Sequence, residues 1–131
     1  KNEEAIKQID LEIKQNGDNP FFEYNKGKAL NNLNRHEESL VSYDRAIALF
    51  PEYILAWNNK GYALHLLGKN DEALECLEKA LSINPEGDYA FNQFLTFDVQ
   101  RIKKDCYGSM VDILNSLGRT SDAADYKSKI N

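Results

Sequence analysis

The sequence has few cysteines, a minority of positive charges and no long apolar run. Its 131 residues include two cysteines, Cys76 and Cys106. They fall in separate helical patterns, so we expect no disulfide framework, and the reducing cytoplasm is the default location. No apolar run approaches the roughly 20 residues of a membrane-spanning helix. The chain begins at Lys1 without a methionine, from which we expect it to be part of a longer protein.

Acidic residues outnumber basic ones, 21 to 16, and the formal net charge is −5. A negatively charged chain is repelled by phosphate groups. The charge therefore argues against nucleic acid or an anionic membrane surface as the main partner.

The residues that usually carry catalysis are not grouped in this sequence. His36 falls in a turn, and His65 has no acidic or cysteine neighbour at ligand spacing. There is no glycine-rich phosphate loop and no cluster with the spacing of metal ligands. The sequence therefore predicts a protein that is not an enzyme and that holds no metal or cofactor.

The stretch from Trp57 to Pro85 shows the clearest local pattern in the chain. Small and apolar residues recur every three or four positions in two segments, which indicates two amphipathic helices. The first carries Trp57, Gly61, Leu64 and Leu67, and the second carries Ala73, Leu74, Leu77, Ala80 and Leu81. Gly68 can end the first helix in a left-handed conformation. Pro85 ends the second, because the residue before a proline avoids the helical region.

The same residue types recur 34 positions earlier. Gly61, Leu64, Leu67, Ala80 and Pro85 have counterparts at Gly27, Leu30, Leu33, Ala46 and Pro51. This period, with its small, large and proline positions in register, resembles the tetratricopeptide repeat. Residues 54–87 follow the pattern nearly throughout and residues 20–53 follow it well. One departure is Glu23, which stands where the second copy has Trp57, and we expect Phe21 or Phe22 to replace that aromatic side chain.

The resemblance implies an all-α fold, a right-handed superhelix (an α-solenoid) of stacked antiparallel helix pairs. Each pair leaves an apolar face that the next pair must cover. We expect helices at roughly 21–33, 37–50, 55–67 and 71–83. Small residues such as Gly61 should let the helix backbones approach closely.

Both ends of the chain depart from the pattern. Residues 1–16 match only the second helix of a unit, with Ala5, Ile9 and Ile13 at its apolar positions, and are predicted to form a half repeat or capping helix. After Pro85 the register fails, and the leucine-glycine turn returns at Leu117–Gly118, about 16 positions late.

We therefore expect residues 88–131 to form a divergent third repeat, an irregular and extended helical hairpin. Its first helix would run from about 88 to 116 and its last from about 120 to 130, and a break near Gly108 is the alternative. Phe91, Phe94 and Phe97 should cover the last regular repeat or contact another subunit.

In tetratricopeptide-repeat proteins the first helices line a concave groove that binds peptides or partner helices. The resemblance thus implies a protein-interaction module. Beside the core stripe, the first helices carry polar and aromatic residues spaced by three and four, which share one face. The predicted peptide-binding residues are Tyr24, Lys28, Asn31, Asn58, Asn59, Tyr62, His65 and Asn92. Tyrosine offers a large rigid area, and asparagine can both donate and accept hydrogen bonds.

One tetratricopeptide-repeat subclass binds the acidic tails of heat-shock chaperones. Asn59 matches its central asparagine, but Tyr24, Lys28, Asn92 and Thr96 stand where the other binding residues belong, so that ligand is not predicted. The alternative function is structural self-association, in which the terminal helices or the extended C-terminal helix form a homodimer.

Overall fold

The computed structural model describes residues 1–83 and 99–130 of the chain. Within these ranges the chain forms seven helices and no strand, as the sequence predicted. They are α1 (Asn2–Asn16), α2 (Pro20–Asn32), α3 (His36–Leu49), α4 (Ile54–Leu66), α5 (Asn70–Ser82), α7 (Val99–Ser116) and α8 (Thr120–Lys127). Helices α2 to α5 each begin and end one residue before the expected position.

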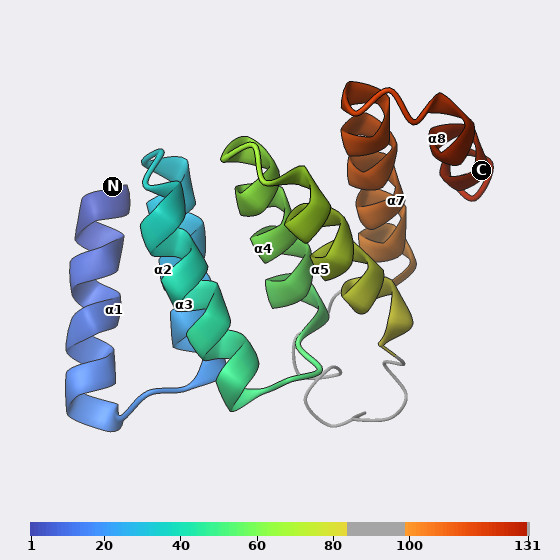
Figure 1. The fold of residues 1–131 in the computed structure, drawn as a ribbon. Coiled ribbons are helices and arrows are strands. Elements are labelled where there is room, and N and C mark those ends of the chain that lie inside the picture. Colours follow the sequence, from blue (N-terminus) through green and yellow to red (C-terminus); the bar gives the residue numbers. More distant parts are fainter. Residues whose placement is uncertain (84–98, 131) are drawn as a thin grey trace.

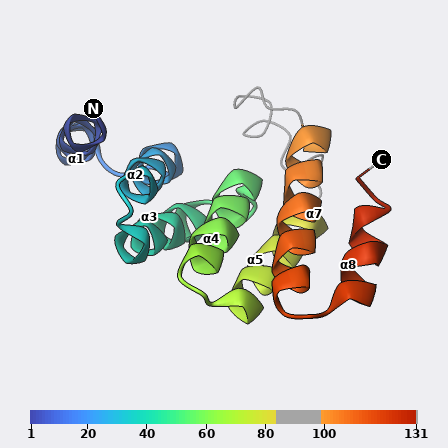
Figure 2. The ribbon, with the colours of Figure 1, turned by 90° about the horizontal axis from the view of Figure 1, so that it is seen from above.

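The helices form antiparallel pairs that stack side by side (Figure 1). Helix α2 pairs with α3, α4 with α5 and α7 with α8, while α3–α4 and α5–α7 contacts join successive pairs. Seen from above, α2 and α4 lie in one layer and α3 and α5 in the other (Figure 2). The architecture is the predicted right-handed α-solenoid.

Close approach within each regular pair depends on one glycine. A Cβ added at Gly61 would lie 2.9 Å from Leu77 Cγ, and one added at Gly27 would lie 2.5 Å from Tyr43 Cε1. Leu77 and Tyr43 are both essentially fully buried. The large side chain of the second helix thus fills the space that the glycine leaves on the first.

The turns that join the two helices of the three pairs share one backbone conformation. Its central residue is Asn34, Gly68 or Gly118, with φ of 61°, 79° and 76°. The next residue then donates its N–H to a leucine carbonyl, from Lys69 to Leu64 (2.9 Å) and from Arg119 to Leu114 (2.8 Å). Gly68 therefore caps α4 in the left-handed conformation that the sequence predicted.

The C-terminal hairpin repeats the preceding pair at an offset of 50 residues, from Gly68 to Gly118. Its buried side chains are Ile102, Cys106, Met110, Ile113, Leu114 and Ala123. Helix α7 runs unbroken through Gly108, so the alternative of a break there is wrong. The expected start of this helix near residue 88 lies outside the described residues, as do Phe91, Phe94 and Phe97.

Helix α1 contacts only α2 among the described helices. Ile6 is buried against Ala29 and Leu30, whereas Ala5 is exposed and Ile9 and Ile13 are half-buried. Ile9 stands 34 positions before Tyr43, which packs on the first helix of its own pair. The described residues provide no such helix for α1, so the side predicted to be apolar stays partly open.

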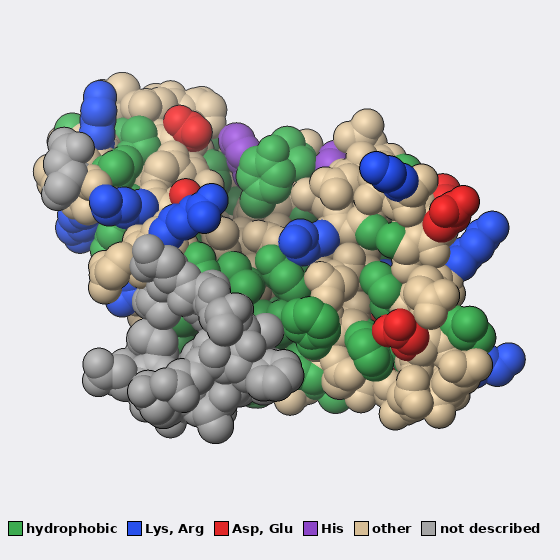
Figure 3. Space-filling view, turned by 180° about the vertical axis from the view of Figure 1, so that it is seen from behind, with side chains coloured by type: hydrophobic (Ala, Val, Ile, Leu, Met, Phe, Trp, Pro, Cys, Tyr) green, Lys and Arg blue, Asp and Glu red, His purple; other side chains and the backbone are tan. Residues whose placement is uncertain are grey.

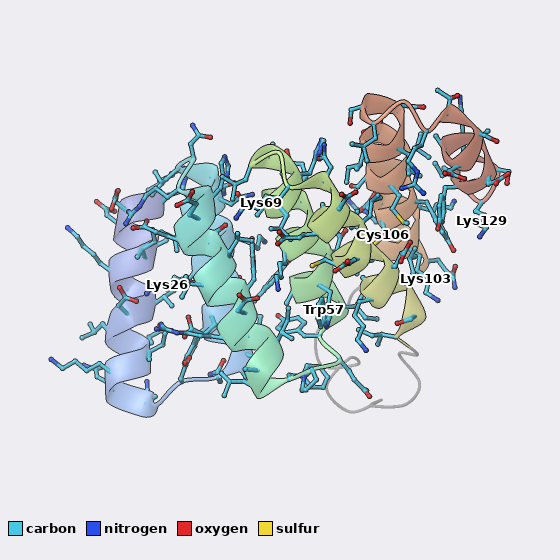
Figure 4. The ribbon with its side chains drawn as sticks, viewed as in Figure 1. Lys26, Trp57, Lys69, Lys103, Cys106 and Lys129 are labelled. Atoms are coloured by element: carbon cyan, nitrogen blue, oxygen red, sulfur yellow. The ribbon has the colours of Figure 1, made fainter. Side chains whose placement is uncertain are left out.

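Ion pairs at equivalent positions join neighbouring pairs. Lys26 Nζ lies 2.7 Å from Asp10 Oδ1, and Lys60 Nζ lies 2.6 Å from Asp44 Oδ1. Each lysine is therefore bound to an aspartate of the preceding helix, and Lys26 lies between α1 and the next pair (Figure 4).

Glu23 differs from what the sequence suggested. Its side chain is buried, with 1% of the residue exposed, in the position that Trp57 holds one repeat later, whereas Phe21 is 46% exposed. Phe21 therefore does not replace the missing aromatic side chain, and Phe22 is only half-buried.

Candidate partner-binding face

The side of α2 and α4 turned away from α3 and α5 is here called the inner face. It is shown in Figure 3, where hydrophobic side chains gather across its middle. Seven of the eight predicted peptide-binding residues belong to α2 and α4. The eighth, Asn92, lies outside the described residues.

Tyr24 is part of the core. Only 8% of the residue is exposed, and its ring centroid lies 5.1 Å from that of Tyr53 and 6.1 Å from that of Tyr43. Its hydroxyl accepts a hydrogen bond from Asn59 Nδ2 at 3.1 Å. Burial raises the pKa of the Tyr24 phenol, and the Asn59 hydrogen bond partly offsets this. Tyr24 therefore positions Asn59 and offers little area of its own.

Asn58 links α4 to the C-terminal hairpin. Its Oδ1 accepts a hydrogen bond from the Cys106 thiol at 3.2 Å, and Cys106 is fully buried. Figure 4 labels Cys106. Burial, together with the nearby Asp105 carboxylate, raises the pKa of that thiol to about 12, so it stays protonated and can donate. Asn58 thus has a structural bond that the sequence register did not predict.

Asn31 and His65 bind side chains at the ends of the inner helices. His65 Nδ1 lies 2.8 Å from Asn70 Oδ1, and Asn31 Oδ1 bonds His36 Nδ1. The two pairs are equivalent with their residue types exchanged, because 31 and 36 correspond to 65 and 70. Their first role is to join the two helices of a pair.

Large side chains remain open on the inner face. Tyr62 is 48% exposed and Leu66, one turn later, is 44% exposed. Lys28 is also exposed, with Nζ 5.5 Å from the Tyr24 ring centroid, within the range of a cation–π contact. The sequence analysis named Tyr62 and Lys28 but missed Leu66. Its spacing of four from Tyr62 was the available signal.

The hollows of the described surface lie elsewhere. One of about 260 Å³ is lined by Ile6, Lys26 and Arg45, and one of about 320 Å³ by Trp57, Lys60 and Lys79. Lys26 and Arg45 of the first hollow correspond to Lys60 and Lys79 of the second, 34 positions later, and each hollow contains a lysine of the inter-pair ion pairs. These two hollows therefore arise where neighbouring helix pairs stack, and they recur from one repeat to the next.

Neither metal chemistry nor a membrane span is indicated by the described part of the chain. Among residues 1–83 and 99–130, no three His, Cys, Asp or Glu side chains are grouped to hold a metal ion. Over the same ranges, no helix combines the length and apolar character needed to cross a bilayer.

Comparisons with known proteins agree with this architecture. A family model described as a tetratricopeptide repeat matches residues 54–86, and a second, described as a TPR repeat, matches residues 27–68. A search of the curated proteins finds no match.

Solved structures show the same fold. A crystal structure of MamA aligns with a TM-score of 0.81 at 22% identity, covering 98% of this chain and 66% of its own. A second MamA crystal structure gives 0.79 at 22% identity, with 98% and 62% covered. A MamA RS-1 ArsTM double mutant gives 0.61 at 19% identity, with 98% and 83% covered. This chain thus spans about two thirds of the first two.

Proposed function

Because this chain is a tetratricopeptide-repeat protein, we propose that it is a non-catalytic scaffold whose inner face binds a peptide or partner protein. The supporting observation is the pair Tyr62 and Leu66, which leaves large apolar area exposed on the inner helix of the second repeat. Tyrosine is among the residues that most often supply the affinity at interfaces, and apolar neighbours such as Leu66 help to exclude water around it.

Polar groups beside this pair suit a peptide main chain. Asn59 donates one amide hydrogen to the Tyr24 hydroxyl, and this bond fixes the orientation of the amide. An amide group carries two donor hydrogens and an acceptor oxygen. Held in this way, Asn59 can offer its other groups without losing much conformational freedom on binding.

The site residues divide into two roles in this proposal. Tyr62, Leu66, Lys28 and Asn59 contact the partner directly. Of the other predicted residues, Tyr24, Asn31, Asn58 and His65 orient the inner helices through their own bonds. Two buried free thiols agree with the cytoplasmic location that the sequence analysis expected.

The test is a peptide-display selection against the intact chain, followed by affinity measurement with the selected peptides. Tyr62→Ala and Leu66→Ala should each weaken binding by more than about 1 kcal/mol, roughly fivefold. Circular dichroism should show unchanged helicity, because both side chains are about half exposed.

Val41→Ala is the matched control. Val41 is an apolar residue of α3, 52% exposed on the other layer. It should leave affinity unchanged. Equal losses in the Val41 and Tyr62 variants, or a loss confined to Val41, would place binding outside the inner face.

Self-association is the second candidate, supported by the open side of α1. Ile9 and Ile13 are half-buried on that side, and Leu11, on another face of the same helix, is 45% exposed. Light scattering over a range of concentrations separates the two candidates. A dimer that dissociates in Leu11→Asp would favour self-association through the N-terminal helix. A monomer at all concentrations would favour the partner-binding scaffold.

A further inference from the structure

Glu23 replaces an aromatic residue at the point where α2 meets the preceding connection. We infer that the carboxyl groups of Glu23 and Asp18, here called the carboxyl pair, form a proton-dependent contact that holds the α1–α2 connection. Deprotonation of this pair is proposed to loosen α1. This regulatory role is independent of the proposed partner binding.

The internal repeat shows what this position does elsewhere. Trp57 stands 34 positions after Glu23, and its indole Nε1 donates a hydrogen bond of 2.8 Å to the carbonyl of Pro51 in the α3–α4 connection. Gly17 of the α1–α2 connection corresponds to Pro51, and Asp18 follows it. In both places the side chain from the first turn of the inner helix reaches back to the connection before it.

The difference lies in which partner can donate. An indole always carries a hydrogen, whereas two carboxylates are both acceptors. Glu23 Oε1 is buried and has no hydrogen-bond donor in the described part of the chain. The Asp18 carboxyl lies beside it. A hydrogen bond between the two groups therefore requires a shared proton, and without one the like charges repel.

The nearby cations offset the negative charge of the carboxyl pair only in part. Arg45 of α3 places Nη1 3.9 Å from Glu23 Oε2, but that side chain is 60% exposed. Lys26 of α2 is held 2.7 Å from Asp10 of α1. Burial first, and then the Asp18 carboxyl, raise the pKa of Glu23 to about 7, while Arg45 and Lys26 act in the opposite direction.

Helix α1 is the element most dependent on this contact. It touches only α2 among the described helices, through the small cluster around Ile6. The ion pairs of Asp10 with Lys26 and of Glu3 with Arg35 add surface contacts. Loss of the carboxyl pair removes one of the few restraints on the connection that leads out of α1.

The direction of the pH effect follows from the raised pKa. A carboxyl that binds its proton more tightly in the folded state stabilises the fold below its unfolded pKa. That contribution is lost as the pH rises from about 4.5 through about 7. The carboxyl pair should therefore hold the α1–α2 connection in weak acid and release it in weak base.

The experiment is an NMR titration of the intact chain labelled with ¹³C and ¹⁵N. We expect the Glu23 side-chain carboxyl to titrate with a midpoint near pH 7. The backbone amide signals of Ile6 and Ile9 should shift with the same midpoint. A Glu23 midpoint near the ordinary value of about 4.3 would overturn the inference. So would α1 amides that do not follow the Glu23 titration.

Two variants separate this role from simple structural support. Glu23→Gln places a permanent amide donor beside Asp18, so the α1 amides should lose the step near neutrality while keeping their acid-form positions. Asp18→Asn, at an exposed site, should lower the Glu23 midpoint and also abolish the step. Glu38→Gln, on the exposed surface of α3, is the control and should leave the step in place. Persistence of the same step in Glu23→Gln would contradict the inference.

Discussion

Asn59 donates a hydrogen bond of 3.1 Å to the hydroxyl of Tyr24, joining the inner helices of the two regular repeats. The Tyr24 ring is buried between Tyr43 and Tyr53, so this bond connects the aromatic core to the inner face. It fixes Asn59 relative to Tyr62, one turn later on α4.

Removal of this hydrogen bond should lower stability measurably. We predict that Tyr24→Phe reduces the free energy of unfolding by about 1 kcal/mol, the usual net value of one intramolecular hydrogen bond. Urea unfolding followed by circular dichroism measures the change. Tyr62→Phe is the control, because that exposed side chain should lose nothing. Equal stability of the Tyr24 variant and the parent would show that the bond contributes no stability.

Gly61 and Gly108 should respond in opposite directions to added side chains. Gly61→Leu should destabilise by about 1–3 kcal/mol, since overpacking forces Leu77 out of its place. A Cβ at Gly108 meets nothing within 4 Å, so Gly108→Ala should stabilise α7 by about 0.5–1 kcal/mol. Melting midpoints that move in the same direction for both variants would contradict the close approach at Gly61.

The role of Gly68 can be tested by comparison with Asn34, the equivalent turn residue one repeat earlier. Gly68 has φ of 79°, so Gly68→Ala should cost about 1–2 kcal/mol of stability. Gly68→Asn should cost less, because Asn34 already adopts φ of 61° at the equivalent turn. Thermal unfolding ranks the two variants, and an asparagine variant less stable than the alanine variant would refute the equivalence of these turns.

Both thiols should be protected in the folded protein. Cys106 is fully buried and Cys76 is 6% exposed, and burial raises the pKa of each. The reactive thiolate is therefore scarce at about pH 8. Mass spectrometry after iodoacetamide treatment should find modification only under unfolding conditions. Fast modification of Cys106 in the native chain would contradict its bond to Asn58.

The regular repeats could be predicted because their pattern is local. Glycine, alanine and proline positions at a period of 34 locate α2 to α5 to within one residue. The role of Glu23 could not be foreseen, because a glutamate at an aromatic position carries no sign that Asp18 will lie beside it. The approach of Cys106 to Asn58 depends on the offset of 50 residues, which the 34-residue register does not contain.

The candidate site was predicted less well than the fold for a physical reason. Helical spacing places Tyr24 and Tyr62 on the same face of their helices, but burial depends on what the next segment adds. Tyr53, at the end of the α3–α4 connection, covers the Tyr24 ring. Tyr62 has no such neighbour among residues 1–83 and 99–130 and stays 48% exposed.

The most direct test of partner binding is NMR chemical-shift mapping with a peptide selected on the intact chain. Partner binding at the inner face predicts that the largest amide shifts occur around Tyr62, Leu66 and Lys28, while Val41 and Leu49 on α3 stay unchanged. Shifts concentrated around Val41 and Leu49, with Tyr62 and Leu66 unaffected, would contradict the account.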